Sequence, residues 1–199
     1  MTAKQFFTSN AFKCIIVLTC IALISGGLLA ILNDVLYISE EERTKQAIKK
    51  IYGQELNYTE IELTDEVANN QYGVINNVYK LEDNNYLIKS TGNEGYKGGT
   101  VTLWIVAEFA DNNFVGLKKV QVAEFNKQTL MSSFVKSYYD NFTSNNDKVI
   151  SGAFFDKTAG TNSDGAENIG VVNSGATFSS NAINRAVNCA LTYIRTNLV

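Results

Sequence analysis

The longest hydrophobic stretch of the chain lies close to its start. It runs from Phe12 to Leu32, reads FKCIIVLTCIALISGGLLAIL, and holds one charge, Lys13, at its edge. A helix of this length measures about 31 Å, which matches the ~30 Å hydrocarbon core of a bilayer. The pattern predicts an uncleaved membrane anchor. Two alternatives stay open, namely a signal peptide cleaved near the small residues 25–27 and a lipoprotein modified at Cys20.

The charges on the two sides of this stretch differ. Lys4 precedes it and Lys13 lies at its start, whereas Asp34 and Glu40 follow it. Basic residues favour the cytoplasmic side, so the remainder of the chain is expected to face outward at the cell membrane. The sequence then divides into a cytoplasmic N-terminus with a transmembrane anchor (1–33), a surface linker helix (34–55) and an extracytoplasmic domain (56–199).

The segment SEEERTKQAIKKIYG has the pattern of a surface helix. Ser39 and Glu42 have the spacing of a capping box, and Gly53 is placed to end the helix. Its apolar positions, Ala47, Ile48 and Ile51, form only a narrow stripe.

Hydrophobic and polar residues then alternate with a period of two, which predicts strands. YGVINNVYKL and NYLIKST flank a turn at Asp83-Asn84. GTVTLWIVAEFA and FVGLKKVQVAEF flank DNN at 111–113 and predict a β-hairpin. In the first strand of that hairpin one face carries Val101, Leu103, Ile105, Ala107 and Phe109, and Trp104 lies on the other.

Helical spacing returns in the second half of the domain. Leu130, Phe134 and Tyr138 predict one helix within QTLMSSFVKSYYDNF, and a last helix is expected from about Ser180 to Asn197. The polar span from 143 to 170 is predicted to be mostly loop. The fold class is therefore α+β: an antiparallel sheet with flanking helices, preceded by one N-terminal transmembrane helix.

Composition limits the chemistry. Histidine is absent and only three cysteines are present, Cys14, Cys20 and Cys189. The sequence thus excludes Ser-His-Asp and Cys-His catalysis, His-ligated metals and iron–sulfur clusters, and we expect no metal site. Any catalysis by side chains would have to rest on carboxylates, lysine or tyrosine. The net charge of −3 argues against a nucleic-acid partner.

The stretch NSGATFSS, residues 173–180, places a threonine between small residues directly before the last helix. One interpretation is structural: Ser179, Ser180 or Asn181 caps the helix, and Gly175 supplies a turn. The other is that Thr177 is an attachment point. The two interpretations are compatible, since a neighbouring serine can cap the helix while Thr177 carries a group.

SGAT within this stretch resembles the flavinylation motif S/T-G-A-T/S of FMN-binding domains, the family of the Rnf complex G subunit and the Na⁺-translocating NADH:quinone reductase C subunit. GYKGGTVTLWIV, from Gly95 to Val106, is similar to the family's GYxG stretch before a core strand. The family also has one N-terminal membrane helix and the motif before a final helix. Two departures are Val171, where the family usually has Asp, and KQTLMSS in place of E-T-P-G-L-G.

The resemblance implies FMN joined covalently, by a flavin transferase, through a phosphoester to Thr177. The residues expected around the cofactor come from three segments, with Trp104 as a further candidate to flank the flavin ring. They are Ser174, Gly175, Ala176, Phe178, Ser179 and Ser180 in the motif, Tyr96 and Gly98 in GYKG, and Gln128 and Thr129 after the hairpin.

The resemblance further implies an electron-transfer subunit of an ion-translocating, Rnf-like membrane oxidoreductase, with other membrane subunits as partners. Such a subunit moves electrons through its flavin and is not a catalyst by itself. Two alternatives stay open: a standalone flavinylated surface carrier that reduces an extracellular acceptor, and a non-redox surface protein.

Overall fold

The computed structural model describes residues 10–36, 38–161, 165 and 167–199. The chain forms two compact units, 1–46 and 47–199, and helix α3 is shared between them. The first unit contains helix α2 (Asn10–Leu36), in which Phe12–Asn33 is long and apolar enough to cross a membrane. Thr19 and Ser25 donate their hydroxyls to carbonyls one turn earlier, so these polar groups are satisfied within the helix.

Helix α3 (Glu40–Tyr52) begins and ends as the sequence predicts. Ser39 Oγ accepts a hydrogen bond from the Glu42 amide at 3.2 Å, which is the N-terminal half of a capping box. Gly53 adopts φ = +76°, and its amide bonds to the Lys49 carbonyl.

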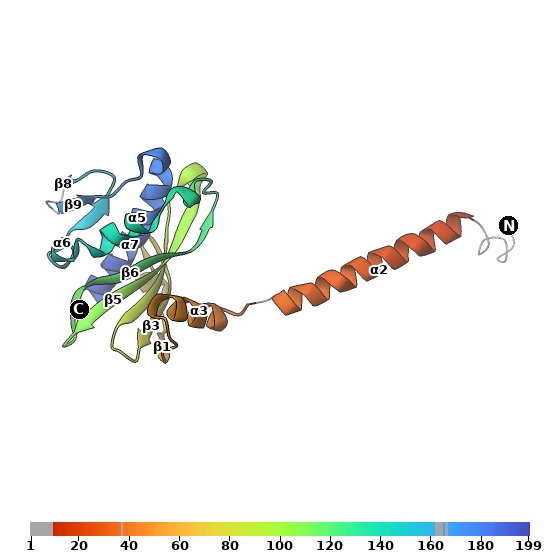
Figure 1. The fold of residues 1–199 in the computed structure, drawn as a ribbon, viewed down its shortest axis with the longest axis horizontal. Helices are drawn as coiled ribbons and strands as arrows, with labels where there is room; N and C mark the ends of the chain where they lie inside the picture. Colours follow the sequence, from red (N-terminus) through yellow and green to blue (C-terminus); the bar gives the residue numbers. More distant parts are fainter. Residues whose placement is uncertain (1–9, 37, 162–164, 166) are drawn as a thin grey trace. The chain divides into compact units, whose positions relative to one another are not determined.

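An antiparallel sheet forms the centre of the second unit (Figure 1), with strand order β1-β3-β4-β5-β6 and β2 paired to β3. The predicted hairpin is confirmed: β5 and β6 pair in antiparallel register, and Asp111 and Asn112 turn the chain with φ values of +51° and +63°. The strands are β1 (Tyr58–Ile61), β2 (Asn69–Asn70), β3 (Gly73–Leu81), β4 (Tyr86–Gly92), β5 (Thr100–Ala110) and β6 (Asn113–Asn126), with a short helix α4 (Asp65–Ala68) between β1 and β2.

Helix α7 (Thr177–Asn197) packs across one face of this sheet against β3, β4 and β5. The predicted alternation of β5 is confirmed: Val101, Leu103, Ile105 and Ala107 share one face and are buried in the core beneath α7. At Gly92 the helix approaches so closely that a Cβ atom would lie 2.0 Å from the Ala182 carbonyl oxygen. Burial of apolar surface is the dominant favourable term in folding, and the larger of the two apolar clusters lies on this face.

The opposite face of the sheet carries a second, smaller apolar cluster. Trp104 and Val106 of β5 are buried there with Tyr79, Leu81 and Leu87, and Ala47 and Ile48 of α3 cover them. The narrow apolar stripe of α3 is thus sufficient to bury part of that helix.

Two predictions in the second half of the domain were wrong. The helix expected around Leu130 begins only at Lys136, as α5 (Lys136–Thr143), after a 3₁₀ turn at Met131–Ser133, and Leu130 is exposed. The span 143–170 contains ordered elements as well as loops: α6 (Asn146–Ile150) and a small sheet in which β9 (Glu167–Gly170) lies between β7 (Phe154–Asp156), its parallel neighbour, and β8 (Gly160–Thr161).

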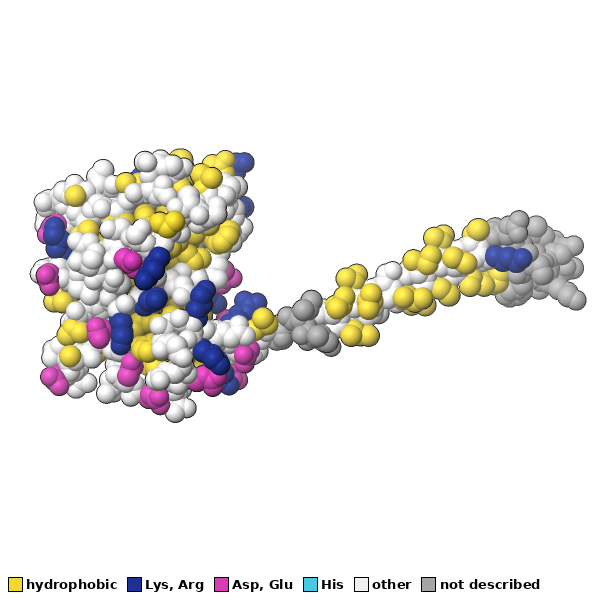
Figure 2. Space-filling model, in the orientation of Figure 1, with side chains coloured by type: hydrophobic (Ala, Val, Ile, Leu, Met, Phe, Trp, Pro, Cys, Tyr) yellow, Lys and Arg dark blue, Asp and Glu magenta, His cyan; other side chains and the backbone are white. Residues whose placement is uncertain are grey.

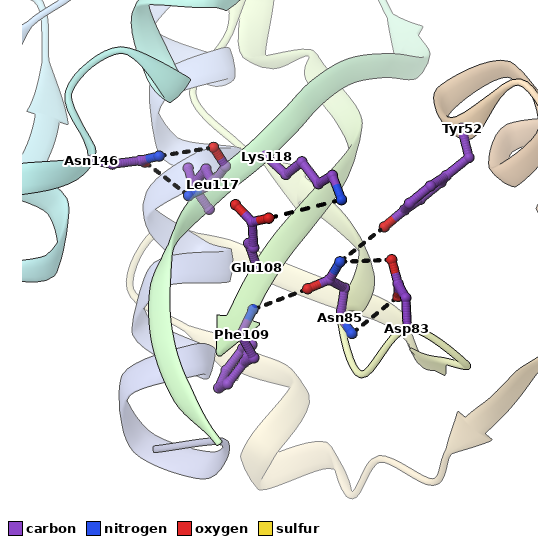
Figure 3. Close-up of polar contacts among 8 residues, drawn as sticks. All are labelled: Tyr52, Asp83, Asn85, Glu108, Phe109, Leu117, Lys118 and Asn146. Carbon is purple, nitrogen blue, oxygen red and sulfur yellow. Dashed lines mark hydrogen bonds and ion pairs between the residues drawn. The ribbon is translucent and has the colours of Figure 1, made fainter. Parts of the chain in front are cut away.

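Three asparagine side chains join separate elements of the domain. Asn188 of α7 pairs with both backbone groups of Phe155, at 2.8 Å each. Asn146 of α6 does the same to Leu117 on β6, as Figure 3 shows. Figure 3 also shows Asn85 after the β3–β4 turn, where it bonds to Asp83, Tyr52 and the Phe109 amide.

Candidate flavin-attachment site

The segment before α7 is fixed by Asn173 rather than by a capping serine. A 3₁₀ turn (Ser174–Ala176) leads directly into α7, which begins at Thr177, earlier than predicted. Asn173 Oδ1 accepts a hydrogen bond from the Gly175 amide at 3.2 Å, and Asn173 Nδ2 donates to Ser133. The prediction that Ser179, Ser180 or Asn181 caps the helix is wrong, because all three lie inside it.

The two predicted capping serines make tertiary contacts instead. Ser180 is fully buried, and its Oγ accepts a hydrogen bond from the Asn173 amide at 2.9 Å. Ser179 Oγ donates to Gln128 Oε1 at 2.8 Å. These bonds hold the first turn of α7 against the rest of the domain.

Thr177 is the first residue of α7 and is exposed to solvent. Its hydroxyl makes one long contact, 3.4 Å, with the Ser174 carbonyl oxygen. The first amides of an α-helix have no intrahelical acceptor, and the helix dipole is positive at this end. Thr177 therefore combines an accessible hydroxyl with a backbone environment that favours an anion such as phosphate.

A cavity of about 320 Å³ opens beside Thr177, within the usual range of small-ligand pockets. Eight of the eleven residues predicted around the cofactor line it; they are Tyr96, Thr129, Ser174, Gly175, Ala176, Thr177, Phe178 and Ser179. Sequence reasoning did not assign Leu130 to the site, although it lines the cavity and is 48% exposed. The available signal in the sequence was the position of Leu130 directly after Thr129.

Two aromatic side chains flank the cavity. The ring centroids of Tyr96 and Phe178 are 6.4 Å apart with an interplanar angle of 58°, and the side chains are 37% and 65% exposed. Lys97 Nζ lies 5.4 Å from the Tyr96 ring centroid. A planar ring placed here would meet aromatic surface that is otherwise open to water.

Gln128 lies beneath the cavity and is nearly fully buried. Its Oε1 accepts hydrogen bonds from the Tyr96 amide and the Ser179 hydroxyl, and its Nε2 donates to the Asn126 carbonyl. Gln128 thus joins the GYKG turn, the end of β6 and the start of α7. Its role is to position the lining, not to line the cavity.

The remaining predicted residues lie elsewhere. Gly98 is in the GYKG turn, with φ = +68°, and Ser180 is buried; neither lines the cavity. Trp104 is buried on the opposite face of the sheet, with Lys89 Nζ 5.5 Å from its ring centroid, so the expectation that it flanks a flavin ring was wrong. Among the described residues no group of three or more His, Cys, Asp and Glu side chains could hold a metal ion.

Comparison of the chain with protein-family models, with curated proteins and with solved structures found no match.

Proposed function

We propose that the chain is a membrane-anchored electron carrier with FMN joined through a phosphoester to Thr177. The observation that carries the proposal is the exposed Thr177 hydroxyl at the start of α7, beside a cavity flanked by Tyr96 and Phe178. It supports the resemblance of SGAT to a flavinylation motif with a geometry that suits a phosphate and a planar ring.

The residues present fit this group. The Thr177 hydroxyl loses its proton as the Oγ–P bond forms. The co-reactant is a flavin dinucleotide: a P–O bond of its pyrophosphate breaks, and the nucleoside monophosphate leaves with that proton. The positive end of the α7 dipole would stabilise the phosphate charge by about 0.3–2 kcal/mol. This is too little to retain the cofactor, so the covalent bond holds it and the helix end orients it. Bound FMN supplies transfer of one or two electrons.

The intact mass of the full chain from its native host tests the attachment. We expect a gain equal to FMN minus one water, and fluorescence of the denatured band in a gel. A Thr177→Val variant should lose both. The matched control is Thr59→Val, the same change at an exposed position on β1, which should keep the flavin. An unmodified mass for the wild-type chain would contradict the proposal.

We further propose that the carrier belongs to an Rnf-like, ion-translocating complex and that its domain faces outward. Lys4 and Lys13 support the orientation. A cysteine placed at exposed Lys157 should react with an impermeant maleimide in intact cells. Loss of electron flow on deleting the chain from a reconstituted complex would favour a subunit, whereas purification alone in mild detergent would favour a standalone carrier.

A further inference from the structure

A second and larger cavity, about 610 Å³, lies beside β6, an edge strand of the sheet. We call it the β6–α5 cleft. It shares no lining residue with the cavity at Thr177. Figure 2 shows Lys and Arg side chains gathered around an apolar hollow on this side of the domain. Its lining comprises Lys50 of α3, residues 118–122 and Phe125 of β6, Met131, Ser132 and Phe134, and Lys136, Tyr139, Asp140 and Thr143 of α5.

The floor of the β6–α5 cleft is apolar and aromatic. Val120, Met131 and Phe134 belong to the main core, and Tyr139 is half-buried against it. Phe125 remains 52% exposed. Burial raises the pKa of the Tyr139 phenol to about 12, so this side chain adds no negative charge near neutral pH. A flat apolar group that binds in the cleft would therefore displace water from an apolar surface.

The rim of the cleft is basic. Lys118 is engaged, since it lies 3.9 Å from a Glu108 carboxylate oxygen and over the Tyr52 ring (Figure 3). For Lys50, Lys119 and Lys136, no carboxylate of the described residues lies within ion-pair distance, and Asp140 is the one carboxylate in the lining. Three lysines without an ion-pair partner among the described residues therefore line one cavity, although the net charge of the chain is −3.

The placement of the lysines argues for a ligand. Lysines on an edge strand discourage pairing with other sheets, and this accounts for the presence of Lys118 and Lys119 on β6. Lys50 and Lys136 come from helices, however, and converge on the same apolar floor. Like charges gathered at one place repel each other, and an anion between them relieves that repulsion.

We propose that the β6–α5 cleft binds a small aromatic anion, a planar ring that carries a phosphate or carboxylate group. The ring packs on Phe125, Phe134 and Tyr139, and the anionic group pairs with Lys50, Lys119 and Lys136. The site is independent of the proposed flavin at Thr177.

Calorimetric titration of the full chain in zwitterionic lipid nanodiscs, against empty discs, tests this site. The probes are 1-naphthyl phosphate, inorganic phosphate and 1-naphthol. We expect one equivalent of naphthyl phosphate to bind at least tenfold more tightly than either fragment. Lys119→Gln/Lys136→Gln should weaken it by about tenfold or more, which corresponds to about 1.4 kcal/mol. The matched control is Lys80→Gln/Lys157→Gln, the same charge change at exposed positions outside the cleft, and should bind as wild type does.

Several outcomes would overturn the proposal: no binding of naphthyl phosphate, equal binding of inorganic phosphate, or equal weakening in the control variant. Tight binding of an acidic extended peptide such as Ac-EFEV-NH₂ in place of naphthyl phosphate would make the cleft a protein-docking groove instead. Thr177→Val should bind the probe as wild type does, so failure of the flavin proposal and failure of this one are separable.

Discussion

Ser179 donates its hydroxyl to Gln128 Oε1 at 2.8 Å and so fixes the first turn of α7 to the end of β6, 51 residues earlier in the chain. The same oxygen accepts the Tyr96 amide. One buried acceptor thus sets the distance between the two aromatic sides of the cavity at Thr177.

Replacing Gln128 should loosen the cavity and destabilise the domain. Gln128→Leu leaves the buried Ser179 hydroxyl without its acceptor, which costs about 1–3 kcal/mol. Urea unfolding of the full chain, followed by fluorescence of the single tryptophan, Trp104, measures this loss. Gln54→Leu, at an exposed position, should change the free energy of unfolding little; equal losses in both variants would contradict the assigned role.

Substitutions of Thr177 should separate attachment from stability. Thr177→Ser keeps a hydroxyl and should keep the flavin, whereas Thr177→Val should not. Because Thr177 is exposed and its hydroxyl makes only a 3.4 Å contact, we expect both variants to unfold within about 0.5 kcal/mol of wild type. A large loss of stability in Thr177→Val would indicate a structural role.

Two glycines should differ in their sensitivity to alanine. In Gly92→Ala the new Cβ would lie 2.0 Å from the Ala182 oxygen and 2.4 Å from the Ala186 nitrogen. Helix α7 must then move away from β4, at a cost of about 3 kcal/mol or more. In Gly175→Ala the nearest atom is Asn173 Oδ1 at 3.6 Å, an ordinary contact. Thermal unfolding should leave Gly175→Ala close to wild type, and similar losses in both variants would refute the close approach.

Asn188 should be one of the most sensitive polar residues. It satisfies both the amide and the carbonyl of buried Phe155. Asn188→Ala leaves both groups unpaired, and we expect a loss of about 3 kcal/mol in the free energy of unfolding. Asn197→Ala removes only a contact within the last turn of α7 and serves as the control. Hydrogen exchange at the Phe155 amide should increase in the Asn188 variant alone.

Alkaline pH should destabilise the domain through its buried tyrosines. Burial raises the pKa of Tyr52 and of Tyr139 to about 12, from an ordinary 10.0, and also raises the pKa of Tyr138. The folded state therefore holds these protons more tightly than the unfolded state. The stability they contribute is complete below about pH 10 and is lost as the pH rises toward 12.

Tyr138→Phe tests this dependence. The Tyr138 hydroxyl is buried and has no hydrogen-bond partner in the described part of the chain, so its removal should not lower stability near neutral pH. Above about pH 10 the variant should lose stability less steeply than wild type. Parallel curves of unfolding free energy against pH would contradict this expectation.

Patterns of local origin were predictable from the sequence. The β5–β6 hairpin follows from alternation around Asp111-Asn112, and the start of α3 follows from Ser39 and Glu42, because each signal lies within a few residues of its effect. The lining of the cavity was largely predictable too, but only through the resemblance of short motifs.

What depended on distant partners was not predictable. Ser179 and Ser180 are good capping residues by type, yet Gln128 and Asn173 engage them from elsewhere in the chain. The spacing of Leu130, Phe134 and Tyr138 suits a helix, but the contact of Asn173 with Ser133 joins the segment before α5 to the start of α7. The β6–α5 cleft gathers lysines from three elements, and no local pattern marks it.

Asn146 has a consequence for the pairing of one copy of the chain with another. Its amide occupies the backbone groups of Leu117 that a neighbouring strand would otherwise use, and Gly116, with no side chain, leaves room for it. At this point the sheet is closed to a strand from a second molecule. A strand from a neighbouring copy therefore finds no free backbone groups at Leu117.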